Sequence, residues 1–547
     1  MRGLFATSIG VTCAAALALP LTPPADAATV RPAPAAEAAS AGTAGATSPG
    51  ARTTPTRPGA TGVPGRPGLP DAPGLPGSTQ SLPLAPLADR ALGAAPGLGL
   101  PRREVHRFSL LGVVWDDPSA ELHGRVQVRT RPAGSDAWSG WQDVETHNAD
   151  HGADPGTTES ASGRTHGATA PLWVGDSDGV EVRVRPQTER RTEETGRGAR
   201  TLSTVAPLPA GLRLDLVDPG ETAPGHAPAG PPHSRSLSSD ADPPGEPGEP
   251  GEPGEPGEPG SVGAEAAGDT AGSAKTADAS ADLPEGLPAE EAESVESVEA
   301  AEASAANEAL APFGALEIPG LDRAATEREL FALRGGELTQ AQRAAPYIGP
   351  RPSIVTRRGW GADESLRESG FRYTTKVKAA FVHHTASGNG YTCAQAPSVI
   401  RGIYRYHVRS MGWRDIGYNF LVDKCGKIYE GRAGGVAKAV LGAHTLGFNT
   451  NSMGVAVLGT FGSAKPSAAT VDAVARLTAW KLGLFGANPK GKTYLTSGGG
   501  NLYGKGKSVR LNVISGHRDG FATECPGKQL YGKLGSARST AAHYQGR

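Results

Sequence analysis

Two long stretches rich in Gly, Pro and Ala separate the parts of this 547-residue chain that can build a core from those that cannot. The first covers residues 28–102 and the second residues 221–348, which include five consecutive Gly-Glu-Pro triplets. The chain has 76 Gly and 47 Pro, and only 5% of its residues are aromatic. Because such segments bury too little apolar surface to offset the entropy of ordering, we expect both to be disordered spacers. Two folded regions are therefore predicted, at 103–220 and 349–547.

The first 27 residues have the pattern of an export signal. Arg2 supplies a positive start, an apolar run covers residues 4–21, and Ala-Asp-Ala at 25–27 offers a cleavage site between small residues. A membrane anchor is the weaker alternative, because prolines end a run that is short for a span. We therefore expect a secreted protein, extracellular or cell-wall associated, with no transmembrane segment in its mature form. The net charge of −2 gives no case for nucleic-acid binding.

Strict alternation of apolar and polar residues marks three segments of the first folded region, at 125–129, 180–185 and 212–216. This period of two predicts half-buried strands, so residues 103–220 are predicted to form an all-β module. His147 and His151 lie in a polar loop of this module. We interpret both as surface residues without a role.

Apolar runs and helical patterns follow one another in the second folded region. Strands are predicted at 378–385, 418–422, 427–430, 452–461 and 509–515. Helices are predicted at 394–411, after Pro466, and at 528–544. Interleaved strands and helices indicate an α/β domain with a mixed central sheet flanked by helices.

Two segments that directly follow predicted strands carry metal-binding side chains. His383 and His384 end the strand at 378–385, and His517 follows the strand at 509–515, with Cys525 eight residues later. Neighbouring residues of a strand face opposite sides, so one histidine of the pair can line a site while the other packs elsewhere. A histidine at a strand end is, however, more often a satisfied polar residue than a ligand.

The number of cysteines favours a metal. Of four cysteines, Cys13 leaves with the signal, and the remaining three are an odd number in an exported chain. One thiol therefore needs a partner other than a second thiol. Three nitrogen or sulfur ligands with a fourth position open to water are the arrangement of a catalytic zinc ion. The patterns indicate a zinc site and do not decide whether it is hydrolytic.

A series of motifs occurs in a fixed order in the second folded region: Arg-Gly-Trp-Gly-Ala at 358–362, Phe-Val-His-His-Thr-Ala at 381–386, Gly-Trp-Arg-Asp-Ile-Gly-Tyr-Asn-Phe-Leu-Val at 412–422, Tyr-Glu-Gly-Arg at 429–432, Gly-Ala-His-Thr at 442–445, and Gly-His-Arg-Asp through Cys-Pro-Gly at 516–527. This series resembles the peptidoglycan recognition protein family, which is related to the type-2 amidases of phages and bacteria. The resemblance covers about residues 350–545. The β module resembles, more loosely, the accessory domain that precedes this amidase in secreted actinobacterial proteins.

The resemblance implies a zinc-dependent N-acetylmuramoyl-L-alanine amidase. The zinc ligands would be His383, His517 and Cys525, which non-catalytic members typically do not keep complete. Tyr418 and Thr523 would lie beside the metal and stabilise the oxyanion formed during hydrolysis. The substrate would be peptidoglycan, or a muropeptide derived from it, and we expect a monomer.

The resemblance also names residues of the binding groove, namely His407, His444 and Asn449. Recycling amidases related to the family place a glutamate in the strand that here contains Gly454 through Val457, so the general base is left to an activated water or to Tyr418. Glu524 is a remote candidate. The sequence after Glu-Gly-Arg leaves the choice between diaminopimelate and lysine stem peptides open.

Cys393 and Cys425 are assigned to a disulfide that ties the start of a helix to a hairpin turn, and this pairing departs from the better-known disulfide of the family. Two other functions compete with the amidase. One is peptidoglycan binding without turnover, which the complete ligand set disfavours. The other is a cysteine peptidase that uses Cys525 with His517, which Pro526 and the second convergent histidine disfavour.

Overall fold

The computed structural model describes residues 77–87, 97–195, 198–221 and 298–547, and all of them belong to one unit of the chain, Leu69–Arg547. The predicted signal peptide and most of the two predicted spacers lie outside the described residues. Within the described ranges, none of the helices combines the length and the apolar character that crossing a membrane requires.

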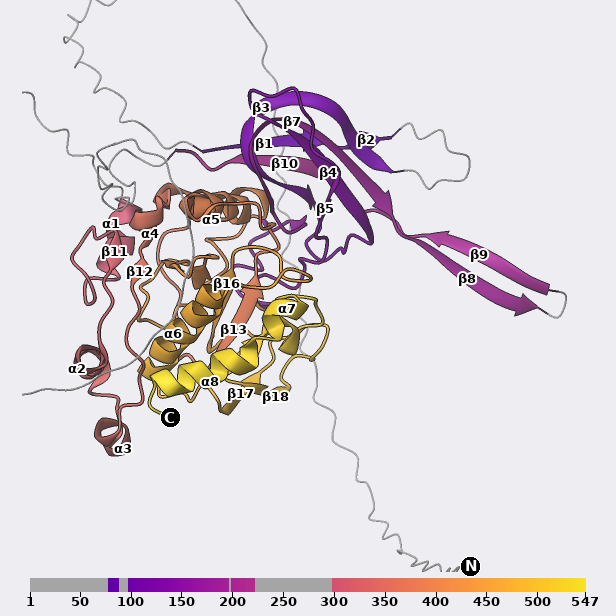
Figure 1. Cartoon of the computed structure of the whole chain (residues 1–547). Helices are drawn as coiled ribbons and strands as arrows, with labels where there is room; N and C mark the ends of the chain where they lie inside the picture. Colours follow the sequence, from indigo (N-terminus) through magenta and orange to yellow (C-terminus); the bar gives the residue numbers. More distant parts are fainter. Residues whose placement is uncertain (1–76, 88–96, 196–197, 222–297) are drawn as a thin grey trace, which may run out of the picture. The chain divides into compact units, whose positions relative to one another are not determined.

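The N-terminal region is an antiparallel β module, as predicted (Figure 1). Its main sheet has the strand order β1-β10-β3-β7-β4-β5, with β2 and β6 also paired to β3. A separate hairpin pairs β8 with β9. The strands are β1 (Ser78–Pro83), β2 (Ala85–Pro86), β3 (Leu98–Trp115), β4 (Gly124–Pro132), β5 (Gln142–Val144), β6 (Gly167–Ala168), β7 (Leu172–Pro186), β8 (Thr188–Thr195), β9 (Gly198–Val205) and β10 (Arg213–Asp218).

The β module begins earlier than the predicted boundary at residue 103. Strand β1 pairs with β10 along its whole length, with Leu82 opposite Leu214. The alternating valines of β7, Val180, Val182 and Val184, are buried in the core of the sheet. The start of the module was misplaced because Gly and Pro surround these first strands, and pairing to a distant strand is what orders them.

The C-terminal domain contains a seven-stranded mixed sheet in the order β11-β12-β15-β14-β16-β13-β19. The central neighbours β14, β16, β13 and β19 are parallel, whereas β14 and β15 form an antiparallel hairpin. The strands are β11 (Glu317–Ile318), β12 (Ile354–Val355), β13 (Ala379–His384), β14 (Phe420–Val422), β15 (Ile428–Glu430), β16 (Ser452–Val457) and β19 (Ile514–Gly516), and a two-stranded sheet adds β17 (Lys492–Thr496) and β18 (Ser508–Asn512).

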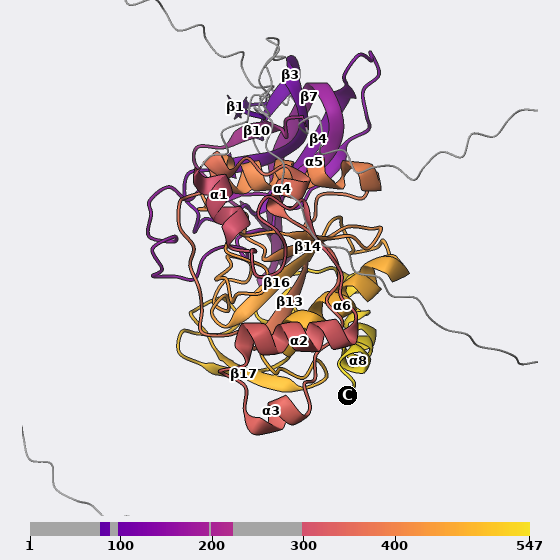
Figure 2. The same ribbon diagram turned by 90° about the vertical axis from the view of Figure 1, so that its left-hand side faces the viewer.

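Helices cover both faces of this sheet, which confirms the predicted α/β class. In both views, β13 and β16 lie between α5 (Ala396–Arg405) on one side and the pair α6 (Ala468–Leu484) and α8 (Leu534–Tyr544) on the other (Figure 1, Figure 2). Residues of β14 alternate between the two layers. Phe420 and Val422 pack in the cluster that contains α6 and α8, and Leu421 packs in the cluster that contains α5. The remaining short helices are α4 (Arg357–Trp360), η1 (Glu364–Leu366), η2 (Cys393–Gln395), η3 (Tyr406–Ser410), η4 (His517–Asp519) and α7 (Lys528–Tyr531).

The end of the predicted linker is folded, which corrects the boundary at residue 349. Residues 298–348 contain α1 (Val298–Ala305), β11, α2 (Arg323–Arg334) and α3 (Gln340–Ala344). A few apolar side chains anchor this segment in the main core: Leu310, Ile318, Leu330 and Ile348. Asn307 adds hydrogen bonds of 2.9 and 3.0 Å to the Glu430 carboxylate. The boundary was misplaced because it was predicted from the average composition of a long Ala- and Glu-rich stretch, in which a few isolated apolar residues carry little weight.

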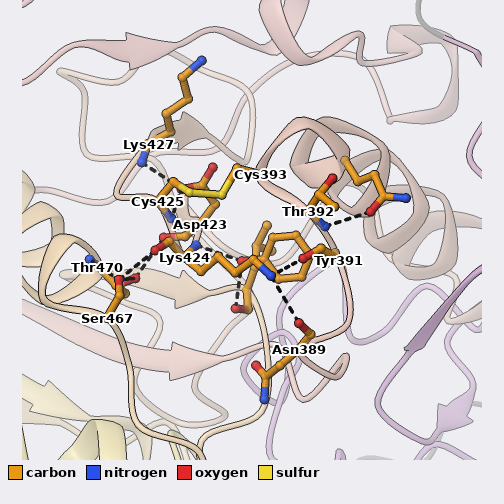
Figure 3. Close-up of a disulfide and its surroundings, with 12 residues drawn as sticks. Asn389, Tyr391, Thr392, Cys393, Asp423, Lys424, Cys425, Lys427, Ser467 and Thr470 are labelled. Atoms are coloured by element: carbon orange, nitrogen blue, oxygen red, sulfur yellow. Dashed lines mark hydrogen bonds between the residues drawn. A yellow bond between two sulfur atoms is a disulfide. The ribbon is translucent and has the colours of Figure 1, made fainter. Parts of the chain in front are cut away.

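A disulfide joins Cys393 and Cys425, whose Cα atoms lie 6.2 Å apart (Figure 3). Cys393 begins η2, which leads into α5, and Cys425 lies in the turn between β14 and β15. Asp423 closes that turn by accepting hydrogen bonds from the backbone N–H groups of Cys425 and Lys427, both at 2.9 Å. The disulfide therefore links the start of α5 to the turn of the β14–β15 hairpin.

Candidate metal centre

Two parallel strands bring His383 and His517 together. In the pairing of β13 with β19, Val382 lies opposite Gly516, so the residue that follows each of these two is a histidine: His383 in β13 and His517 at the start of η4, directly after β19. Their ring centroids are 4.5 Å apart, and both side chains are fully buried. His384 faces the other side, where its Nδ1 accepts a hydrogen bond of 3.3 Å from the Phe461 backbone N–H. As predicted for neighbouring strand residues, one histidine of the pair faces the group and the other makes a hydrogen bond elsewhere.

A tight loop returns Cys525 to His383. The backbone N–H of Arg518 donates to the carbonyl oxygen of Cys525 at 3.0 Å, which closes the loop between them. The Cys525 Sγ lies 3.8 Å from the His383 Nδ1. Cys525 is buried and is the free cysteine among the described residues.

A fourth side chain, His151 of the β module, completes the group. One ligand atom from each of His151, His383, His517 and Cys525 lies within 4.8 Å of all the others. The His151 ring centroid is 4.6 Å from that of His517 and 5.3 Å from that of His383. The interpretation of His151 as a surface residue is therefore wrong. Its loop has no periodic pattern, and the contact joins distant parts of the chain, so no local signal in the sequence could reveal it.

The unpartnered nitrogens of these side chains fit a metal ion. Three ring nitrogens of the group have no hydrogen-bond partner among the described residues: both nitrogens of His517 and the Nε2 of His151. Buried polar atoms without a partner are rare, and a cation would satisfy them. Bond lengths of about 2.0–2.1 Å for nitrogen and about 2.3 Å for sulfur place two tetrahedral zinc ligands roughly 3.3–3.6 Å apart. A small contraction of the group would reach this spacing.

Burial sets the charge state of the side chains in the group. Burial and the neighbouring histidines lower the pKa of His383 well below its usual value, and burial lowers the pKa of His517 to about 3. Both rings are therefore neutral, the form that binds metals. Burial raises the pKa of the Cys525 thiol, and the nearby Asp150 carboxylate raises it further. A thiolate at this position needs a positive charge beside it, which a divalent cation supplies.

Tyr418 and Thr523 both lie at the edge of the group. The Tyr418 ring centroid is 5.5 Å from that of His383, and burial raises the pKa of its phenol well above the usual value. The Thr523 hydroxyl accepts a hydrogen bond of 3.1 Å from the Cys525 backbone N–H.

The predicted groove residues surround the group as well. His407 accepts a hydrogen bond of 3.2 Å from the Gly417 backbone N–H at its Nδ1, and its ring packs 5.7 Å from that of Tyr418. The His444 ring centroid lies 5.3 Å from that of His383. Asn449 accepts from the His444 backbone N–H at 2.7 Å and donates to the Gly152 carbonyl oxygen of the β module at 2.8 Å. A residue expected to contact substrate thus contacts the β module.

The fold and the site define an amidase-type domain, and comparison with known proteins agrees. The N-acetylmuramoyl-L-alanine amidase family model matches residues 373–528. A second model, described as Rv3811 N-terminal galactose-binding domain-like, matches residues 69–205.

Similar proteins include peptidoglycan-recognition protein SC1a of Drosophila melanogaster, which is 30% identical over 188 residues, covering 34% of this chain and 87% of the relative. Peptidoglycan-recognition protein SC2 of Drosophila simulans is 28% identical over 182 residues, covering 33% of this chain and 84% of the relative. The chain therefore belongs to the peptidoglycan recognition protein family through its C-terminal domain. Among solved structures, wild-type Drosophila PGRP-LB is 26% identical with a TM-score of 0.27, covering 34% of this chain and 92% of that chain.

Proposed function

We propose that this protein is an exported, zinc-dependent amidase that hydrolyses the bond between N-acetylmuramic acid and L-alanine in peptidoglycan. The observation that carries the proposal is the convergence of His383, His517 and Cys525 at one edge of the sheet of an amidase-family domain. Export accords with the disulfide between Cys393 and Cys425, because such bonds persist in oxidising compartments.

His383, His517 and Cys525 would hold the zinc ion, which supplies a Lewis acid to polarise the scissile carbonyl and to activate water. The chain contributes the remaining steps. Tyr418 is positioned beside His383 to donate its hydroxyl proton in a hydrogen bond to the oxyanion that develops on the carbonyl oxygen. Thr523, two residues before Cys525, assists with its own hydroxyl.

The groove residues would orient the muropeptide. His407 is held by Gly417 and by the Trp413 ring, whose centroid is 4.5 Å from its own, so its position is set before substrate binds. The Nε2 of His444 makes no hydrogen bond among the described residues and is available to a substrate group. Glu524 takes no part, because its side chain is 79% exposed and lies 3.8 Å from Arg518.

Recognition without turnover is the competing function. The names of the relatives describe recognition, and one similar solved structure is a complex of PGRP-LE with tracheal cytotoxin, a monomeric diaminopimelic acid-type peptidoglycan. The two functions differ in one measurable product. Hydrolysis creates new amino groups on L-alanine, and binding creates none.

The test is to incubate purified peptidoglycan with the wild type, with Cys525→Ala and with Glu524→Gln as a matched control. We expect the wild type and Glu524→Gln to produce new L-alanine amino ends. A chelator should abolish this activity and added zinc should restore it. Cys525→Ala should produce no new ends. Activity that survives the chelator would indicate the thiol peptidase instead. The same test is made with His151→Ala, which removes the fourth side chain of the group. If neither the zinc-loaded wild type nor this zinc-loaded variant produces new ends, hydrolysis is rejected and recognition remains.

A further inference from the structure

One loop of the β module lies on the candidate metal centre. This covering loop comprises residues 145–166, between β5 and β6. It contains Asn148, Asp150 and Asp154, which are polar residues with side chains that are nearly fully buried. Loops ordinarily run over the surface with their polar groups in water. Burial of this loop therefore calls for specific partners in the C-terminal domain.

The covering loop places His151 as a ligand would be placed. The Asp150 Oδ1 lies 3.0 Å from the His151 Nδ1. The Asp150 Oδ2 lies 3.6 Å from the His517 Nδ1. A carboxylate that accepts from one ring nitrogen fixes the tautomer and leaves the other nitrogen free for a metal. In His151 that other nitrogen is the Nε2, which has no hydrogen-bond partner among the described residues. The Leu446 backbone N–H holds the Asp150 carbonyl oxygen at 3.0 Å.

Asp154 fixes the loop to the groove. Its Oδ1 accepts hydrogen bonds from the Gly447 backbone N–H at 2.8 Å and from the Asn449 side chain at 2.7 Å. The hydrogen-bond donors of this part of the groove are therefore already occupied by a carboxylate of the same chain.

Glu159 makes a second fixed point. It forms a bidentate ion pair with Arg432, with distances of 2.9 and 3.0 Å, and accepts from the Arg414 backbone N–H at 3.3 Å. The side chains of Arg432 and Glu159 are 4% and 10% exposed. A bidentate pair with this degree of burial is more directional than a surface salt bridge.

The body of the β module supports the loop. Leu110, Val114, Ala168, Trp173 and Val217 share one buried apolar cluster with α5. The Tyr406 hydroxyl donates to the Thr169 carbonyl oxygen at 3.1 Å. The Trp173 backbone N–H donates to the Ser387 carbonyl oxygen at 3.0 Å. The contact between the two domains is therefore apolar at its centre, like a stable interface.

From these contacts we propose that His151 is a fourth ligand of the metal and that the covering loop keeps the site closed in this form of the protein. The first part depends only on a metal at the centre, and the second rests on the proposed amidase function. Catalytic zinc sites keep one position open to water, whereas sites with four protein ligands are closed. The N-terminal module thus acts as an internal inhibitor, and hydrolysis requires the covering loop to leave the groove.

The ligand set is tested by X-ray absorption at the zinc edge on the full chain. We expect one sulfur and three imidazoles in the wild type, and one sulfur, two imidazoles and an oxygen from solvent in His151→Ala. His147→Ala is the matched control, because His147 lies in the same loop with its side chain 75% exposed. It should give the wild-type spectrum. Two imidazoles in the wild type, or a spectrum unchanged in His151→Ala, would overturn the assignment.

The closure is tested by amidase rate on soluble muropeptides. Because the apparent affinity for substrate scales with the fraction of molecules whose groove is open, we expect His151→Ala and, independently, Asp154→Ala to raise kcat/KM several-fold. Asp154→Ala leaves every proposed zinc ligand in place and retains the groove residues. Rates equal to the wild type in both variants would overturn the closure.

The two readouts separate this inference from the proposed function. A spectrum with three imidazoles in a protein that stays inactive after His151→Ala would support the ligand and reject the amidase. A wild type that hydrolyses peptidoglycan with only two imidazoles on its zinc would support the amidase and reject the fourth ligand.

Discussion

Tyr418 has a packing role in the structure and a proposed chemical role, and a single atom distinguishes the two. Its ring packs near two buried histidines, with centroids 5.5 Å from His383 and 5.7 Å from His407. Phenylalanine keeps that ring and removes only the hydroxyl. Because loss of one oxyanion donor costs about 10²–10³ in kcat, we expect Tyr418→Phe to lose activity by that factor. Rates are best compared in the His151→Ala background, where the proposed closure is relieved.

Zinc content distinguishes this effect from damage to the metal centre. Tyr418→Phe should bind one zinc ion per chain with the affinity of its parent, because Tyr418 is not one of the proposed ligands. A variant that loses its zinc, or one that keeps the full rate, would contradict the role assigned to the hydroxyl.

Arg357 is a residue whose role is structural. It is buried, donates to both carboxylate oxygens of Glu364 at 2.7 and 3.1 Å, and donates to Asp415 at 3.1 Å. Removing one partner of a buried ion pair costs about 3–5 kcal/mol, because the remaining charges stay buried without compensation. We expect Arg357→Met to lower the free energy of unfolding of the C-terminal domain by that amount, as measured by urea titration.

An exposed arginine gives the matched comparison. Arg510 lies on β18 with its side chain in solvent, and Arg510→Met should change the free energy by less than about 0.5 kcal/mol. Equal losses in the two variants would mean that the buried network contributes nothing specific.

The sequence predicted the part of the candidate metal centre that depends on strand ends. His383 and His517 each follow an apolar run, and two such runs placed side by side in a parallel sheet bring them together. Cys525 was indicated by the odd number of cysteines and by the family motif. His151 could not be predicted, because its position depends on how two separately folded regions pack against each other.

At the scale of elements, the segment of residues 298–348 is fastened to the main sheet by a few buried side chains and is called the strap below. Leu310, Ile318, Leu330 and Ile348 are buried in the same cluster as α6 and α8. Burying one such side chain stabilises the fold by about 1.5–3 kcal/mol relative to leaving it exposed. Removing all four together should therefore cost the domain most of its stability. We expect a fragment of residues 349–547 to melt well below a fragment of residues 298–547, or to remain unfolded.

Circular dichroism during heating measures both fragments. The comparison contains its own control, because the two fragments share every candidate metal-binding residue of the C-terminal domain. Equal melting temperatures would show that the strap is dispensable and would restore the boundary predicted from composition.

The disulfide is the second element-scale device. It closes a loop with a sequence separation of 32 residues, between the entry to α5 and the turn of the hairpin. Loop-closure entropy predicts a stabilisation of about 3–4 kcal/mol for a loop of this length. We expect the double variant Cys393→Ser and Cys425→Ser to lose stability of that order in urea titration, while zinc binding at Cys525 persists. A loss below about 1 kcal/mol would contradict the entropic account.

Element boundaries were predicted less well than element types. The run at 509–515 was predicted as one strand, yet it divides at Val513 into β18, which pairs with β17, and β19, which enters the main sheet. Both halves satisfy the same apolar pattern, so only tertiary pairing distinguishes them. The folded segment at 298–348 was not predicted for a related reason, because whether it folds depends on a few buried side chains and not on its average composition.

At the scale of the whole molecule, the covalent link between the two regions sets how strongly the β module competes for the groove. A tethered inhibitor acts at a fixed effective concentration, whatever the protein concentration. Cutting the chain between residues 222 and 297, at an introduced protease site, converts this into a bimolecular equilibrium. The interface contacts then hold the covering loop in place only above their own dissociation constant.

We therefore expect the specific amidase rate of the cut protein to rise on dilution, while that of the uncut protein stays constant. The cut Asp154→Ala variant should reach its open, faster state at a higher concentration than the cut wild type, because it lacks the hydrogen bonds to Gly447 and Asn449. Rates measured over a dilution series of the cut and uncut forms test this order. Cut forms of both proteins that match the uncut wild type at every concentration would show that the module does not compete with substrate, whatever ligand it offers the metal.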